Sequence, residues 1–127
     1  MKPNEPEKEK IVREWFEKAF SDLESAEILL RESSHYDIVV YHAHQAIEKY
    51  FKATLLKANK TFRFVHDLNS FFSEASELLP IKQLEEDVSF VNSLYPRLRY
   101  PSGDIVTLEE AEKSLAIAKK ILGPSAR

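Results

Sequence analysis

Residues 95–104, YPRLRYPSGD, are of types suited to binding a phosphate group. Arg97 and Arg99 can each contact phosphate oxygens through two N–H groups, and Tyr100 offers a ring face for stacking. The segment ends at Asp104 and leads toward a helix start, where backbone N–H groups attract anions. It therefore predicts a loop that binds a nucleotide or another phosphate. In the alternative interpretation, the arginines form salt bridges that hold an irregular loop, with the tyrosines packed beneath it.

Four side chains elsewhere are candidates for a wall of the same site: His44, Lys49, Lys52 and His66. Both lysines lie on the polar side of an expected helix over residues 36–57 and would add positive charge if that side borders the loop. In the alternative interpretation they form a solvated face with long apolar stems. His44 lies at the border of the polar side, where a histidine is usually a rim residue. The simplest interpretation of His66 is a turn.

The stretch 41–53, YHAHQAIEKYFKA, contains two histidines that first suggest a metal site. On a helix, His42 and His44 lie about 160° apart, and side chains two positions apart do not face each other. The pair therefore cannot bind one ion together, and we predict neither a metal site nor a cofactor. His44 and Glu48 are one turn apart and can interact.

The helix over residues 36–57 is expected to be central to the fold. Its apolar side chains fall within one arc of about 160° when each residue advances by about 100°. The other half is mixed, because Ile38, Leu55 and Leu56 accompany the polar residues. This mixture predicts a second, lesser contact on the polar side.

Apolar spacing and capping residues predict five helices and no strand. They span about 7–31, about 36–57, a short stretch from Asp67 to Pro80, 81 to about 94, and Thr107 to Gly123. Ser34 with Asp37 is expected to cap the second helix, and Thr107 with Glu110 forms a capping box for the last. Long helices with short connections predict an all-α, up-and-down bundle of four to five helices.

Two connections break the helical pattern. Residues 95–104 cannot form a regular helix throughout, because two prolines and a glycine interrupt them. Residues 61–66 carry Phe62 and Phe64, which are exposed unless other residues cover them. We expect these phenylalanines to take part in a subunit contact rather than in chemistry.

Composition limits the class of protein. The 127 residues suit one domain, with residues 1–6 as a flexible tail. A net charge of −3 gives no overall attraction to nucleic acid, and the lack of cysteine excludes disulfides and thiolate metal sites. The polar N-terminus does not resemble a secretory signal, and no uncharged apolar run approaches the ~18 residues that span a bilayer. We therefore expect a cytoplasmic protein without a membrane contact.

Several stretches together resemble the HEPN domain family. AHQAIEKYFKATLL at 43–56, followed by HDL at 66–68, is similar to the family's second-helix signature, and RYP at 99–101 and EEAEKSLAIAKKIL at 109–122 are further matches. The first helix fits too, with WFEKAFSDLESAEILL at 15–30 ahead of a Ser-His-Tyr-Asp turn. The resemblance covers nearly the whole chain and implies an all-α bundle of four or five helices, commonly dimeric.

The family to which this resemblance points is divided in function. Some members are metal-independent ribonucleases and toxins, and others are nucleotide-binding or accessory modules, often encoded beside a small nucleotidyltransferase that partners them. The ribonucleases carry an arginine followed, roughly four to six residues later, by a histidine, which transfers protons while the arginine stabilises phosphate charge. No histidine follows Arg97 or Arg99, and no other arginine–histidine pair here fits both the spacing and the place.

The resemblance therefore implies an accessory module without catalytic residues, which binds a nucleotide or a partner nucleotidyltransferase in a pair of the toxin–antitoxin kind. A homodimer is expected, and RNA is a further ligand class. The first alternative is a metal-independent ribonuclease that borrows groups across a dimer interface. The second is a dimeric interaction scaffold without a ligand.

Overall fold

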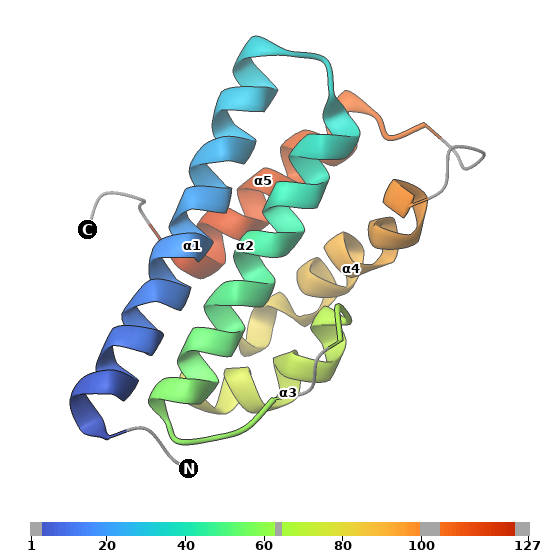
Figure 1. Cartoon of the computed structure of the whole chain (residues 1–127). Helices are drawn as coiled ribbons and strands as arrows, with labels where there is room; N and C mark the ends of the chain where they lie inside the picture. The colour runs from blue at the N-terminus through green and yellow to red at the C-terminus, as the bar shows by residue number, and fades with distance from the viewer. Residues whose placement is uncertain (1–3, 63–64, 100–104, 124–127) are drawn as a thin grey trace.

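The computed structural model describes residues 4–62, 65–99 and 105–123, which form five α-helices and a short 3₁₀ helix (Figure 1). The elements are α1 (Glu5–Glu32), α2 (Tyr36–Lys57), α3 (Leu68–Leu78), η1 (Lys82–Leu84), α4 (Glu85–Arg99) and α5 (Leu108–Leu122). These described ranges contain no strand, and the predicted all-α helical bundle is confirmed.

Helices α1 and α2 form a long antiparallel pair that runs the length of the bundle (Figure 1). α1 begins earlier than the apolar spacing predicts, because the Asn4 side chain caps it by accepting from the N–H of Glu7 at 2.9 Å. The predicted cap of α2 by Ser34 is wrong. His35 occupies the N-cap position without a side-chain hydrogen bond, and its N–H donates to the Ser33 hydroxyl at 3.2 Å.

Helix α2 is central, as predicted, and contacts each of the other four α-helices. Its fully buried apolar residues are Val39, Val40, Ala43, Ala46, Ile47, Phe51 and Ala53. In Figure 1, α5 crosses behind the α1–α2 pair, while α3 and α4 lie beside α2 on the side away from α1. Because α4 covers the mixed half of α2, the predicted second contact exists, and it buries charged side chains.

The last turns of α4 contain part of the predicted phosphate loop. This helix continues to Arg99 instead of ending near Leu94, and Pro96 lies inside it. A proline has no N–H, so the carbonyl one turn earlier, that of Asn92, lacks its usual helical donor. The Asn92 side chain connects α4 to the start of α3, since it accepts from the N–H of Leu68 at 2.9 Å.

Three predicted helix boundaries are confirmed. Asp67 caps α3 by accepting from the N–H of Asn69 at 3.0 Å. The capping box of α5 is formed by Thr107 and Glu110, each side chain accepting from the other residue's N–H at 3.1 and 3.0 Å respectively. Gly123 ends α5 with a φ of 80°, a left-handed conformation that favours glycine.

None of the helices in the described ranges combines the length and the apolar character needed to cross a membrane.

Candidate functional site

Glu48 lies on the side of α2 that faces α4, and its carboxylate joins three polar side chains. The residue is only 2% exposed. Oε2 accepts from Lys52 Nζ at 2.9 Å, while Oε1 lies 3.0 Å from His66 Nδ1 and 3.8 Å from His44 Nδ1. Burying a carboxylate is costly unless it is paired and hydrogen-bonded. The ammonium of Lys52 and the imidazole of His66 therefore stabilise the negative charge of Glu48 inside the bundle.

Tyr95 of α4 lies between two histidine rings. Its ring centroid is 4.4 Å from that of His44, with the planes 34° apart, and 5.4 Å from that of His66, with the planes 22° apart. His44 is fully buried, whereas the side chain of His66 is 56% exposed. The stack thus has one closed end inside the bundle and one end, on the loop before α3, that is open to solvent.

His44 is enclosed completely and is neutral at ordinary pH. Neither ring nitrogen has a well-formed hydrogen bond among the described residues, although Asn92 lies beside the ring. Burial lowers the pKa of His44 from 6.5 to about 4, and the nearby Glu48 carboxylate opposes this only in part. His44 therefore adds no positive charge to a binding surface, and its interpretation as a rim residue is wrong.

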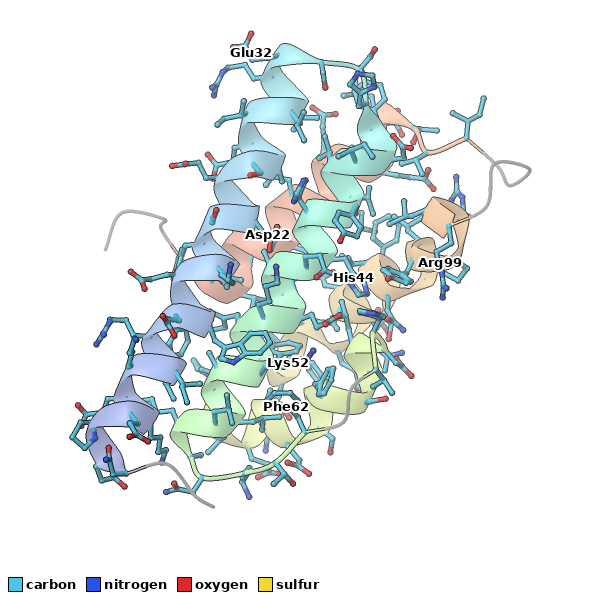
Figure 2. The ribbon with its side chains drawn as sticks, viewed as in Figure 1. Asp22, Glu32, His44, Lys52, Phe62 and Arg99 are labelled. Carbon is cyan, nitrogen blue, oxygen red and sulfur yellow. The ribbon has the colours of Figure 1, made fainter. Side chains whose placement is uncertain are left out.

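Lys52 lies in an aromatic cage next to the loop that carries His66, and Figure 2 shows it beside Phe62. Its Nζ is 5.4 Å from the ring centroid of Trp15, 5.3 Å from that of Phe62 and 5.8 Å from that of Phe71. An ammonium is attracted to aromatic faces, most strongly where water is excluded. Because Lys52 is only 6% exposed, its interpretation as part of a solvated face is wrong.

Phe62 is partly covered by other residues. Its ring packs edge-to-face on Trp15, with centroids 5.9 Å apart, and on Phe71, with centroids 6.4 Å apart. The ring of Phe62 is therefore partly buried against the core, and its expected part in a subunit contact stays a prediction. Phe64 lies outside the described residues.

The open end of the stack is part of a mixed aromatic and basic surface, which we call the stack surface and define as Tyr41, His66, Tyr95 and Arg99. Burial raises the pKa of Tyr95, and the positive charge of Arg99 acts against this, so the guanidinium lies near the phenol. Arg99 is exposed at the outer end of α4 (Figure 2), and Tyr41, which is 40% exposed on α2, also helps to raise the pKa of Tyr95 and so lies near it.

The hydrogen bond to Glu48 determines what His66 can do chemically. An ionised carboxylate only accepts hydrogen bonds, so Nδ1 of His66 carries the proton that is donated to it. Nε2 is then the nitrogen that can bind a ligand or exchange a proton. The site thus combines an oriented imidazole with an aromatic ring and a guanidinium.

The HEPN domain family model matches residues 12–127, which is nearly the whole chain. This chain belongs to the HEPN domain family. The resemblance predicted from the sequence is thereby confirmed. Comparisons with the curated proteins and with the solved structures gave no match.

The HEPN domain brings some of the predicted site residues together. His44, Lys52 and His66 meet at Glu48, and Arg99 lies near the stack through Tyr95. Two other predicted residues, Tyr100 and Asp104, lie outside the described residues.

Lys49 points toward α1, away from the stack surface. Its Nζ lies 2.6 Å from Asp22 Oδ2, and Nδ1 of His42 lies 2.8 Å from Oδ1 of the same carboxylate. Because His42 faces α1 while His44 faces α4, the predicted separation of the two histidines is confirmed. No group of three or more His, Cys, Asp or Glu side chains within the described ranges is placed to hold a metal ion.

Arg97 faces α5. Its Nη1 and Nη2 donate to the two carboxylate oxygens of Glu110 at 2.8 and 3.0 Å, and Nη2 also donates to the carbonyl of Ile105 at 2.8 Å. The hydrogen bond from Arg97 is the main reason why the pKa of Glu110 is lowered. This contact connects the end of α4 to the start of α5. Arg97 therefore follows the alternative interpretation, in which the arginines form salt bridges.

Two residues that organise the site, Glu48 and Tyr95, are absent from the predicted set. A signal for Glu48 exists in the sequence, because it lies one turn from both His44 and Lys52 on a half of α2 that also carries Leu55. Tyr95 belongs to the predicted phosphate segment, but nothing in the sequence shows that its ring lies between two histidines.

Proposed function

We propose that this HEPN domain binds a nucleotide, free or within single-stranded RNA, through the stack surface. One observation carries the proposal: a buried carboxylate holds His66 against Tyr95 while more than half of the histidine side chain faces solvent. A side chain that is oriented before the ligand arrives loses less conformational freedom on binding.

Each part of the stack surface suits one part of a nucleotide. Arg99 can contact phosphate oxygens with two N–H groups of its guanidinium, and the unprotonated Nε2 of His66 can accept a hydrogen bond from a ribose hydroxyl or a base N–H. The exposed ring of Tyr41 offers a face for a base, which binds aromatic side chains whatever its identity. Because the net charge is −3, attraction to phosphate must come from these local groups, and binding should weaken with salt.

Titration calorimetry with ATP and with a uridine hexanucleotide tests the proposal. We expect His66→Ala and Arg99→Ala each to raise Kd about tenfold, because each change removes one hydrogen bond to the ligand. Arg13→Ala is the matched control for Arg99, since it removes the same charge from an exposed position near the start of α1. The proposal is wrong if neither probe binds the wild type, or if Arg13→Ala weakens binding as much as Arg99→Ala.

A protein partner is the second part of the proposal. Helices α2 and α5 begin at the same end of the bundle (Figure 1), and three exposed apolar residues lie at or next to these helix starts: Ile38, Ile105 and Leu108, with Ile105 87% exposed. This apolar end suits a homodimer contact, which light scattering of wild type and Ile105→Asp tests by mass. A nucleotidyltransferase partner, in a pair of the toxin–antitoxin kind, is tested separately by copurification with the product of the adjacent gene.

Metal-independent ribonuclease activity is a second candidate, favoured by the Glu48–His66 pair. A carboxylate on Nδ1 prepares Nε2 to take up and return a proton, and Arg99 would stabilise charge on the phosphate. The histidine here comes from the loop before α3, not from a position after the arginine. Cleavage of RNA in the presence of a chelator, lost in both His66→Ala and Arg99→Ala, would support this activity; cleavage unchanged in both variants would exclude this site.

A further inference from the structure

Lys52 is a charged side chain whose buried position gives a ligand little access. Only 6% of the residue is exposed, and its ammonium lies among three aromatic rings. Any role in binding must therefore act through another residue. The residue it touches is Glu48, through one carboxylate oxygen.

The two oxygens of Glu48 are divided between partners. Lys52 Nζ holds Oε2 at 2.9 Å, and Oε1 is left to His66 at 3.0 Å, with His44 Nδ1 farther away at 3.8 Å. A carboxylate is planar and rigid, so a partner that fixes Oε2 also fixes the direction of Oε1. Without the ammonium, the group would be free to rotate toward His44, whose Nδ1 has no hydrogen-bond partner within the part of the chain that the structure describes.

The aromatic cage keeps the ammonium in place and reaches the same loop. Trp15 belongs to α1, Phe71 to α3, and Phe62 to the loop that leads to His66. Lys52 therefore acts on this loop twice, through the ring of Phe62 and through the carboxylate that binds His66.

We propose that Lys52 is the positioning residue of the stack surface: it directs Oε1 of Glu48 to His66 and so keeps this histidine in the Nδ1–H form, with Nε2 available to the ligand. The effect on ligand binding rests on the proposed function. The tautomer of His66 is a property of the unliganded protein and does not depend on it.

Lys52→Met tests the inference, with Lys49→Met as the matched control. Each change removes one ammonium group of α2 that contacts a carboxylate. Lys52 contacts Glu48, whereas Lys49 contacts Asp22, which lies outside the stack surface. Long-range ¹H–¹⁵N spectra of the histidine rings at pH 8 report the tautomer, and titration with ATP reports binding. Lys52→Gln, read in the same way, replaces Lys52→Met if the latter fails to fold.

We expect wild type and Lys49→Met to show His66 as the Nδ1–H tautomer, and Lys52→Met to show mainly the Nε2–H tautomer. Kd for ATP should rise about tenfold in Lys52→Met and less than twofold in Lys49→Met. A tautomer change without ATP binding by the wild type would support the positioning role and contradict nucleotide binding. An unchanged His66 tautomer in a folded Lys52 variant overturns the inference, because Lys52 would then only compensate the charge of Glu48.

Discussion

The ring centroids of Tyr95 and His44 lie 4.4 Å apart, so that the tyrosine covers a neutral, fully buried histidine. The same tyrosine supports the exposed ring of His66 on its other side. Tyr95 therefore connects the interior of the bundle to the stack surface. Its substitution should affect folding and binding together.

Replacing Tyr95 should show which part of the side chain matters. Tyr95→Ala removes the ring from between the two histidines, so we expect the free energy of unfolding to fall by about 2 kcal/mol, less than for a fully buried aromatic residue. Kd for ATP should rise about tenfold as His66 loses its support. Tyr95→Phe keeps the stack and should change Kd less than twofold. A tenfold loss in the phenylalanine variant would instead assign the binding role to the hydroxyl.

His44 should make the domain sensitive to mild acid. Its pKa is about 4 in the folded chain and 6.5 as the ordinary value, so between these values the unfolded chain binds more protons and stability falls as the pH falls. We expect a loss of about 2 kcal/mol between pH 7 and pH 5, measured by urea unfolding.

The control for this pH effect replaces His44 and, separately, an exposed histidine. His44→Phe should flatten the profile between pH 7 and pH 5, whereas His35→Gln, at the exposed N-cap of α2, should leave it unchanged. The titratable groups that affect the pKa of His44 are Glu48 and His66, so the same titration in His66→Gln shows whether this neighbour contributes. A profile in His44→Phe as steep as that of the wild type would show that another group is responsible.

Local signals made much of the fold predictable. The capping box of Thr107 and Glu110 and the glycine at 123 define α5 within a few neighbouring residues, and both are confirmed. Ser34 fails as a cap because the chain turns one residue later, at His35. α4 passes its predicted end because packing against other helices outweighs the cost of Pro96.

The site was less predictable, because its contacts join distant parts of the chain. Glu48 and His66 are 18 positions apart, and the aromatic cage of Lys52 draws on three separate elements. Helical periodicity places Glu48 and Lys52 on the polar half of α2. It cannot show that α4 and the loop before α3 cover that half and turn solvated charges into a buried network.

The buried pair of Glu48 and Lys52 should behave differently from the outer pair of Asp22 and Lys49. Glu48→Ala leaves an ammonium buried without its partner, and we expect a loss of about 3–5 kcal/mol in urea unfolding. Asp22→Ala should cost about 1 kcal/mol, because Lys49 can turn to solvent. In a double-mutant cycle, Glu48→Ala with Lys52→Met should be less destabilising than the sum of the single changes. Additive effects would show that the two groups are not coupled.

Arg97 and Arg99, two positions apart, should have separate roles. Arg97→Ala breaks the double contact to Glu110 and the bond to the carbonyl of Ile105, so we expect about 1–2 kcal/mol of stability to be lost with less than a twofold change in Kd for ATP. Because the pKa of Glu110 is lowered, this contribution is present above the carboxyl's ordinary pKa of 4.5 and disappears as the pH falls through the lowered value. Arg99→Ala should give the opposite result, with unchanged unfolding and about tenfold weaker binding. If Arg97→Ala weakens binding as strongly as Arg99→Ala at equal stability, the salt-bridge assignment of Arg97 is incomplete, and the stack surface extends to the start of α5.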